Sequence, residues 1–145
     1  MAAGVVHDRV GLVFGVALGV FLIPFFNVVT GFYLLAGYVA GIVWLSPDID
    51  LAQSVVSSRW RCLSGLWAFY RTASGHRGFS HWPIFGTLSR VLYLGMLITP
   101  ALVFLGLRLD WETQGVPLLL GLEVSALVHL ALDKIADVTG LGKNR

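Results

Sequence analysis

Four long apolar runs take up most of the chain and constrain its fold more than any other feature of the sequence. Hydrophobic residues make up 57% of the 145 residues and charged residues 12%, whereas a typical soluble protein has about 25% charged residues. The first two runs have 17 and 15 residues, and at about 1.5 Å per residue helices of this length fall at the short end of what crosses the hydrocarbon core of a bilayer. We therefore predict an all-α integral membrane protein, a bundle of four transmembrane helices at residues 10–26, 31–45, 83–107 and 116–132.

The connections between these runs divide the chain into a helical hairpin, a long connection and a second pair of helices. The first two runs are rich in glycine and alanine, and small residues allow membrane helices to approach closely. Residues 46–82 form the long connection, in which arginines alternate with tryptophan, phenylalanine and tyrosine. Such residues anchor at lipid headgroups, so we predict an interfacial helical connection with a short amphipathic helix around residues 51–70. Residues 1–145 are predicted to form a single membrane domain.

Basic residues gather at one end of the predicted bundle. Four spans place both termini at the same end as the long connection, and the opposite end carries Arg108 alone. Lysine and arginine are concentrated in the cytoplasmic loops of membrane proteins. We therefore predict a protein that is integral to the bacterial inner membrane or a related membrane, with its termini and the long connection in the cytoplasm.

The charge pattern also indicates which partners to expect. The formal net charge of +2 comes from basic residues that lie between apolar runs, and membrane orientation explains it without a nucleic acid. We predict contacts with membrane lipid, and the small residues of the spans favour association with a membrane-protein partner or a second copy of the chain. The single cysteine, Cys62, excludes an internal disulfide.

The side chains best suited to bind a metal fall at the cytoplasmic end of the predicted bundle. Seven histidines and aspartates share this end: His7, Asp48, Asp50, His76, His81, His129 and Asp133. His129 and Asp133 are four residues apart, so they share one face of a helix. Asp48 and Asp50 are two apart after a proline, and in an extended turn both carboxylates can reach one ion. Imidazole and carboxylate ligands suit zinc, manganese or iron, and seven of them suffice for one or two divalent ions.

Each of these residues also has an ordinary structural interpretation. The histidines and aspartates could be polar flanks of the spans, a turn that ends a helix and supplies the next N-cap, or a hydrogen-bonded pair. A joint metal site is favoured because all of them coincide at one end. Glu123 lies roughly 9 Å from His129 toward the membrane centre. We expect it to face the bundle interior, at a substrate pocket or beside a polar group such as Tyr38, outside the ligand set.

Two strings of residues resemble a known family. They are residues 46–50 (Ser-Pro-Asp-Ile-Asp) and residues 76–81 (His-Arg-Gly-Phe-Ser-His), followed by His129 with Asp133. This pattern is similar to the bacterial family of small membrane-associated metal-dependent hydrolases, and most closely to its branch of uncharacterised metal-binding membrane proteins. The resemblance extends over nearly the whole chain and implies the same seven metal ligands. Trp82 follows the second histidine where many relatives have a serine, which implies a different substrate.

Two functions are consistent with these residues. The first is a membrane-embedded, metal-dependent hydrolase that acts at the cytoplasmic face on an amphiphilic, phosphate-containing or lipid-like substrate. Asp50 or Asp133 would orient the attacking water or take its proton. Arg77 would hold a phosphate or stabilise the developing negative charge. The alternative is a non-catalytic metal-binding protein or a structural subunit of a membrane complex, which a fully closed ligand shell would favour.

Overall fold

The computed structural model describes residues 2–75 and 78–139, apart from the side chains of residues 2–8, 20, 22 and 23, and none of the described residues forms a β-strand. Long α-helices correspond to the four apolar runs: α1 (Ala2–Leu22), α2 (Val28–Val43), α5 (Phe85–Phe104) and α6 (Val116–Thr139). Two short helices, α3 (Val55–Arg59) and α4 (Ala68–Ser74), belong to the long connection. The all-α prediction is confirmed. The end of α6 lies beyond the predicted end at residue 132 because the first glycine after Gly121 is Gly140.

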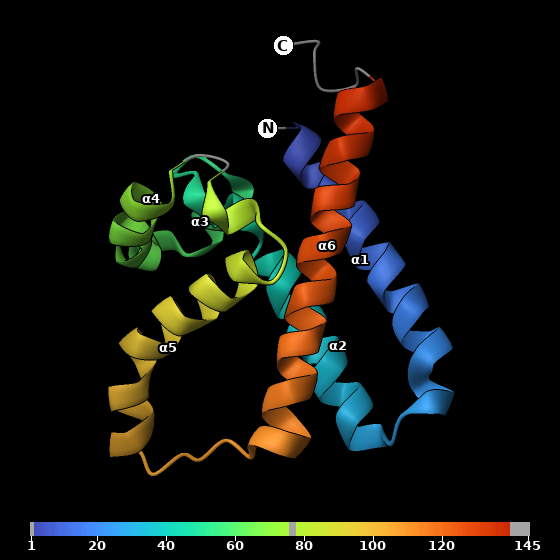
Figure 1. Ribbon diagram of the computed structural model, residues 1–145, viewed down its shortest axis with the longest axis vertical. Helices are drawn as coiled ribbons and strands as arrows, with labels where there is room; N and C mark the ends of the chain where they lie inside the picture. The colour runs from blue at the N-terminus through green and yellow to red at the C-terminus, as the bar shows by residue number, and fades with distance from the viewer. Residues whose placement is uncertain (1, 76–77, 140–145) are drawn as a thin grey trace.

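Helices α1, α2 and α6 form a three-helix bundle (Figure 1). The seam between α2 and α6 is the closest contact in it. A Cβ atom at Gly121 of α6 would overlap the backbone carbonyl of Leu34, and one at Gly37 of α2 would overlap that of Leu118. Glycine at both positions thus lets the two helices meet backbone to backbone, which makes this seam the tightly packed part of the fold.

Helix α5 does not join this bundle along its length. Figure 1 shows α5 diverging from α6 toward the turn that connects them. An apolar cleft of about 310 Å³ separates α5 from α2 and α6, between Leu94 and Ile98 on one side and Ala40 and Leu118 on the other. The predicted four-helix bundle is therefore not supported, since only three of the helices pack closely together.

Two segments of the described chain are long and apolar enough to cross a membrane, namely α5 and Trp111–Thr139, which contains α6. Helix α2 has 16 residues and is roughly 24 Å long. Among the residues whose side chains are described, the apolar stretch of α1 is Arg9–Gly19. Helix α2 is shorter than the hydrocarbon core of about 30 Å, so four spans are not supported. Length and composition alone do not establish a membrane protein, because the core helix of a soluble protein meets the same two criteria.

The connection between α2 and α5 folds into a small helical lobe, rather than into one amphipathic helix at residues 51–70. Ile49, Val56, Trp67 and Tyr70 form its buried core. The residues of the predicted helix divide into α3, a 3₁₀ segment (Arg61–Trp67) and the start of α4. Trp67 and Tyr70, expected to anchor in lipid headgroups, instead pack edge to face in this core with Trp60 against Trp67, whereas Phe69 is 71% exposed. The packing of Trp67 and Tyr70 explains why a single surface helix does not form.

Candidate metal centre

Asp48 lies in a 3₁₀ turn, η2 (Pro47–Asp50), that follows α2. Ser46 is the N-cap of this turn and Pro47 occupies its first position, where the fixed φ and missing N–H of proline suit the start of a helix. Pro47 and Ile49 are buried, so they fix the turn against the lobe. The Asp48 side chain remains 30% exposed, at the boundary between the lobe and α6.

His81 ends a second 3₁₀ turn, η4 (Phe79–His81), shortly before α5. The backbone carbonyl of Ser80 in this turn accepts a 2.7 Å hydrogen bond from the guanidinium of Arg90. Arg90 is only 2% exposed and also donates to the Thr87 hydroxyl. A buried arginine of α5 therefore holds the backbone of the turn that carries His81.

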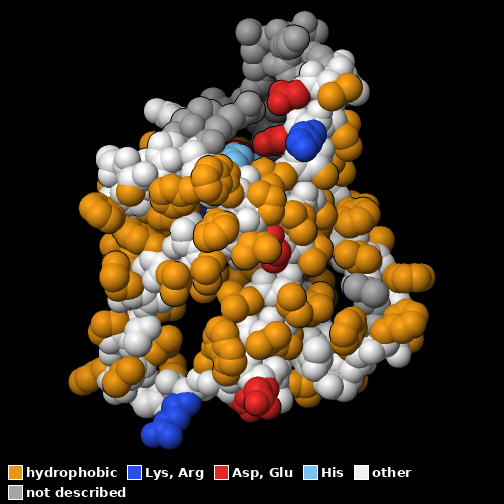
Figure 2. Space-filling view, in the orientation of Figure 1, with side chains coloured by type: hydrophobic (Ala, Val, Ile, Leu, Met, Phe, Trp, Pro, Cys, Tyr) orange, Lys and Arg blue, Asp and Glu red, His pale blue; other side chains and the backbone are white. Residues whose placement is uncertain are grey.

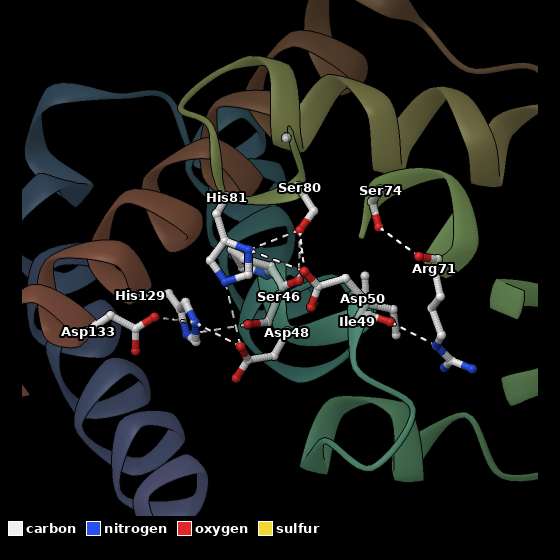
Figure 3. A network of polar contacts seen from close by, with 12 residues as sticks. Ser46, Asp48, Ile49, Asp50, Arg71, Ser74, Ser80, His81, His129 and Asp133 are labelled. Atoms are coloured by element: carbon white, nitrogen blue, oxygen red, sulfur yellow. Dashed lines mark hydrogen bonds and ion pairs between the residues drawn. The ribbon is translucent and has the colours of Figure 1, made fainter. Parts of the chain in front are cut away.

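Asp48, His81 and His129 bring three potential metal ligands together from three separate elements. Nε2 of His129 lies 3.5 Å from Oδ1 of Asp48, and Nε2 of His81 lies 3.8 Å from the same oxygen. The three donor atoms all lie within 4.8 Å of one another, and Figure 3 shows both rings turned toward Asp48. Two ligands about 2.1 Å from a tetrahedral ion are roughly 3.4 Å apart. The donor atoms therefore have the chemistry and the spacing to hold one divalent metal ion.

The second nitrogen of each imidazole ring faces a serine. Nδ1 of His81 lies 3.0 Å from the hydroxyl of Ser80, which in turn donates to Asp50 at 2.9 Å. Nδ1 of His129 lies 3.4 Å from the hydroxyl of Ser46. When Nδ1 donates its proton to such a hydroxyl, Nε2 carries the lone pair that a metal needs. Both rings are thus oriented with Nε2 toward Asp48.

Burial and neighbouring charges have opposite effects on the protonation of this cluster. Burial alone would raise the pKa of Asp48, but its contacts with His129 and His81 outweigh burial and hold that pKa well below its usual range. Burial alone would lower the pKa of His81, but its contacts with Asp48 and Asp50 raise the pKa to about 9. Without a metal, His81 is therefore protonated at neutral pH, and its positive charge lies against Asp48, where a metal cation would be favoured.

Asp50 and Asp133, both predicted as metal ligands and as catalytic groups, occupy different positions. The Asp50 carboxylate is 0% exposed and lies 3.4 Å from Nδ1 of His81, on the side away from Asp48. Residues two apart on a 3₁₀ helix are about 120° apart around its axis, so Asp48 and Asp50 diverge instead of reaching one ion. Oδ2 of Asp133 lies 3.5 Å from Nε2 of His129, and its side chain is 24% exposed. Asp133 therefore borders the donor cluster, whereas Asp50 lies behind His81.

The other predicted site residues are His7, His76 and Arg77. His76 and Arg77 lie outside the described residues, as does the side chain of His7, so their roles as ligands or phosphate-binding groups stay predictions. Glu123 accepts a 2.9 Å hydrogen bond from the backbone N–H of Ile84. The hydroxyl of Tyr38, considered as its partner, donates instead to the carbonyl of Gly11.

Three buried residues that orient the histidines were not predicted from the sequence. Ser46, Ser80 and Arg90 are each 5% exposed or less, and none had been assigned a role. The sequence could have indicated the two serines, because Ser46 and Ser80 lie within the strings at residues 46–50 and 76–81 that also contain the candidate ligands.

A groove of about 460 Å³ lies beside the donor cluster. His81 and Asp133 form part of its wall, and Leu127, Leu130 and Ala131 of α6 contribute apolar lining. The cluster is therefore enclosed on the side of the lobe and borders open space along α6.

The fold and these side chains define an all-helical protein with a candidate Asp/His/His metal site. The chain belongs to the family described as "Uncharacterized metal-binding protein (DUF2227)", whose match covers residues 2–114 and hence Asp48 and His81. It is also similar to an uncharacterised protein of Aquifex aeolicus, with 33% identity over 124 residues, 70% of this chain and 87% of the relative. No solved structure matches the chain. Membership confirms the expected metal-binding family, while membrane association and hydrolysis stay predictions.

Proposed function

We propose that the protein is a membrane-embedded, metal-dependent hydrolase that holds its metal through Asp48, His81 and His129. The observation that carries this proposal is the convergence of two imidazole nitrogens and one carboxylate oxygen, from η2, η4 and α6, within 4.8 Å of one another. Such mixed nitrogen and oxygen ligands suit zinc, manganese or iron. The description of the family as metal-binding supports the same assignment.

The groove beside the cluster favours hydrolysis over a purely structural metal site. Structural zinc sites use four protein ligands, whereas catalytic zinc sites use three and leave a position for water or substrate. Here three ligand atoms meet at the edge of a groove of about 460 Å³. A non-catalytic site is the alternative, and it would need a fourth ligand to close this side.

The side chains around the cluster have distinct roles in the proposed reaction. A bound divalent ion supplies a Lewis acid that lowers the pKa of water and polarises a phosphoryl oxygen. Asp133 borders the donor atoms and the groove, and we assign it the general base that accepts the proton of the attacking water. The new bond joins the water oxygen to phosphorus, the bond to the alcohol oxygen breaks, and Asp133 returns the proton to that oxygen. Asp50, buried behind His81, orients the ring through Ser80.

The exposed apolar surface supports the membrane part of the proposal. In the 18-residue apolar windows of α5 and of Trp111–Thr139, 11% and 33% of the residues are buried. The core helix of a soluble protein would be mostly buried, so this low burial favours a membrane environment. Figure 2 shows hydrophobic side chains over most of one face, with most charged groups toward its upper and lower ends and one acidic group in the middle. We infer that α5 and α6 cross the bilayer and that the α1–α2 hairpin packs beside α6 within it.

The distribution of basic residues supports a cytoplasmic site. Arg9 begins the apolar part of α1, Arg59 and Arg61 belong to the lobe, and Lys134 lies near the end of α6. These segments share one end of the structure in Figure 1, and the turn with Arg108 lies at the other. We propose that the end with more basic residues, which also carries the candidate metal centre, faces the cytoplasm.

Metal content and turnover of the full-length, detergent-purified protein test this function. We expect one or two equivalents of zinc, manganese or iron in the wild-type protein and about none in His81→Ala or His129→Ala. Asp110→Asn, at the opposite end of the structure, serves as the control and should retain the metal. Hydrolysis of para-nitrophenyl phosphate should stop after chelation and return when metal is added.

Two outcomes would change the assignment. Wild-type protein that takes up none of the three metals after incubation would rule out the metal centre. Protein that binds metal and yet hydrolyses no ester in a panel of phosphate monoesters and diesters would favour the non-catalytic alternative.

A further inference from the structure

The groove beside the candidate metal centre extends along one face of α6. Leu127, Leu130, Ala131 and Lys134 line it, and their spacing of three, one and three residues keeps them on the same side of a helix. Asp137 lines its far end, and the ten residue steps from Leu127 to Asp137 span roughly 15 Å. The groove is therefore an elongated channel along the helix, and the metal centre lies on its wall.

The polarity of the lining changes along this length. Leu127 and Leu130 lie toward the middle of α6, together with Pro83 from the segment before α5. Asp133, Lys134 and Asp137 line the end nearer the C-terminus of the helix. In Figure 2 acidic, basic and histidine side chains lie side by side near the upper end of the molecule, above a mainly hydrophobic face. A ligand that matches this lining has an apolar chain and a charged head.

We propose that the groove binds the substrate of the hydrolase as a single-chain amphiphile with a phosphate head, such as an alkyl or prenyl phosphate. This inference rests on the proposed function and adds the substrate class and its site. The chain would lie on Leu127 and Leu130, and the head would reach Lys134 and the metal ligands. A lysine next to a metal site provides the positive charge that a phosphate head needs.

The direction of the polarity gradient supports a lipid-like occupant. If α6 crosses the bilayer, the charged end of the groove lies toward the headgroups of one leaflet and the leucines lie toward the acyl chains. An amphiphile in that leaflet already has this orientation, so it would enter from the side without turning over. The volume of about 460 Å³ lies within the usual range of roughly 300–1,000 Å³ for small-ligand sites.

The charges of the groove indicate that the metal and the substrate bind together. Asp133 and Asp137 flank the single lysine, and two carboxylates repel a phosphate unless a cation offsets them. Binding of the anionic head is therefore expected to require the metal. A free phosphate ion would leave the apolar half of the groove without a partner, which is why an amphiphile is preferred.

Photolabelling of full-length, zinc-loaded protein in phosphatidylcholine nanodiscs tests this site. The probe is dodecyl phosphate with a diazirine near the middle of its chain. We expect the label on the stretch 127–131 of wild-type protein, with competition by excess dodecyl phosphate and none by inorganic phosphate. Leu127→Trp should fill the groove and reduce labelling about tenfold. Leu120→Trp should not, because Leu120 lies on the same helix outside the groove and is similarly exposed, 54% against 45% for Leu127.

The same samples separate this inference from the proposed function. Metal content and hydrolysis of soluble para-nitrophenyl phosphate report on the metal centre alone. Retained hydrolysis with the label elsewhere on the protein, or with equal labelling of Leu127→Trp and wild type, would overturn the groove and leave the hydrolase. Labelling of the groove without hydrolysis of para-nitrophenyl phosphate or dodecyl phosphate would overturn the proposed hydrolase activity and leave the amphiphile-binding site in place. The label position in wild-type protein needs no variant, so a misfolded substitution does not remove the test.

Discussion

The two halves of the candidate metal centre are held in place by different kinds of contact. The α2–α6 half carries His129 on α6 and Asp48 in the turn that directly follows α2, and this turn also packs against the lobe through Pro47 and Ile49. Gly37 and Gly121 bring the backbones of α2 and α6 into direct contact. His81 belongs to the α5 half, which an apolar cleft of about 310 Å³ separates from the bundle. Close packing fixes the first half, and hydrogen bonds to charged groups fix the second. The position of His81 relative to the other two ligands therefore depends on a few polar side chains.

The segment that joins His81 to α5 illustrates this dependence. Ile84 has a φ of 65°, and the backbone N–H of Phe85 donates to the carbonyl of Pro83 at 2.7 Å. Such a γ-turn with a positive φ is strained for a β-branched residue and persists only when its surroundings hold it. The Glu123 carboxylate, which accepts the N–H of Ile84, provides such a contact from α6. Glu123 thus connects the two halves next to the site, in addition to the contacts of Ser80 and His81 with Asp50.

Removal of one ligand from each half should have the largest effect. We expect His81→Ala and His129→Ala each to weaken metal binding by roughly 100- to 1,000-fold, because a structural zinc ion gains about 10–16 kcal/mol from four ligands together. Competition with a chelator of known affinity measures both. If one variant retained wild-type affinity, the metal would belong to one half alone, and the three-ligand arrangement would be wrong.

Addition of one methyl group to each half should have the next largest effect. Gly121→Ala would force α2 and α6 apart, and overpacking of this kind costs about 1–3 kcal/mol of unfolding free energy. Gly95→Ala is the matched control on α5, where a Cβ meets nothing within 4 Å, and should stabilise the helix by about 0.5–1 kcal/mol. Thermal unfolding followed by circular dichroism compares the two. Equal destabilisation would mean that α5 packs as closely as α6.

The same contrast explains how much of the fold and site could be predicted from the sequence. Apolar runs locate helices because hydrophobicity is local, so α1, α2, α5 and α6 were predicted within a few residues at most ends. The angle of α5 was not, since it depends on which helix faces meet. The placement of Asp48, His81 and His129 at one end follows from helix order alone. The position of Asp50 behind His81 needs the 3₁₀ geometry of η2, which the Ser-Pro-Asp string does not specify.

Removal of the serine next to each histidine should lower zinc affinity by different amounts in the two halves. Ser80→Ala breaks the contacts of Nδ1 of His81 and of Asp50, and loss of such supporting groups typically weakens metal binding about 10- to 100-fold. Ser46→Ala should cost less, because the Ser46 hydroxyl lies 3.4 Å from His129 and the ring is already fixed by α6. Isothermal titration with zinc measures both affinities. If Ser46→Ala lost more zinc affinity than Ser80→Ala, the α2–α6 half would be the one that depends on polar side chains, contrary to our assignment.

A change of pH should have the smallest effect, and it acts on the His81 half. Because the pKa of His81 is raised to about 9, its charged contacts stabilise the metal-free protein fully below about pH 6.5 and are lost as the pH rises through 9. Metal needs the deprotonated ring, so its affinity changes in the opposite direction and should rise about fivefold from pH 8 to pH 9. The difference in Tm between zinc-loaded and metal-free protein should therefore widen over this interval.

Asp50→Asn removes one carboxylate that raises the pKa of His81, so the widening of the Tm difference should move to lower pH. An unchanged Tm difference in both proteins would show that His81 releases no proton when metal binds, and would exclude it as a ligand.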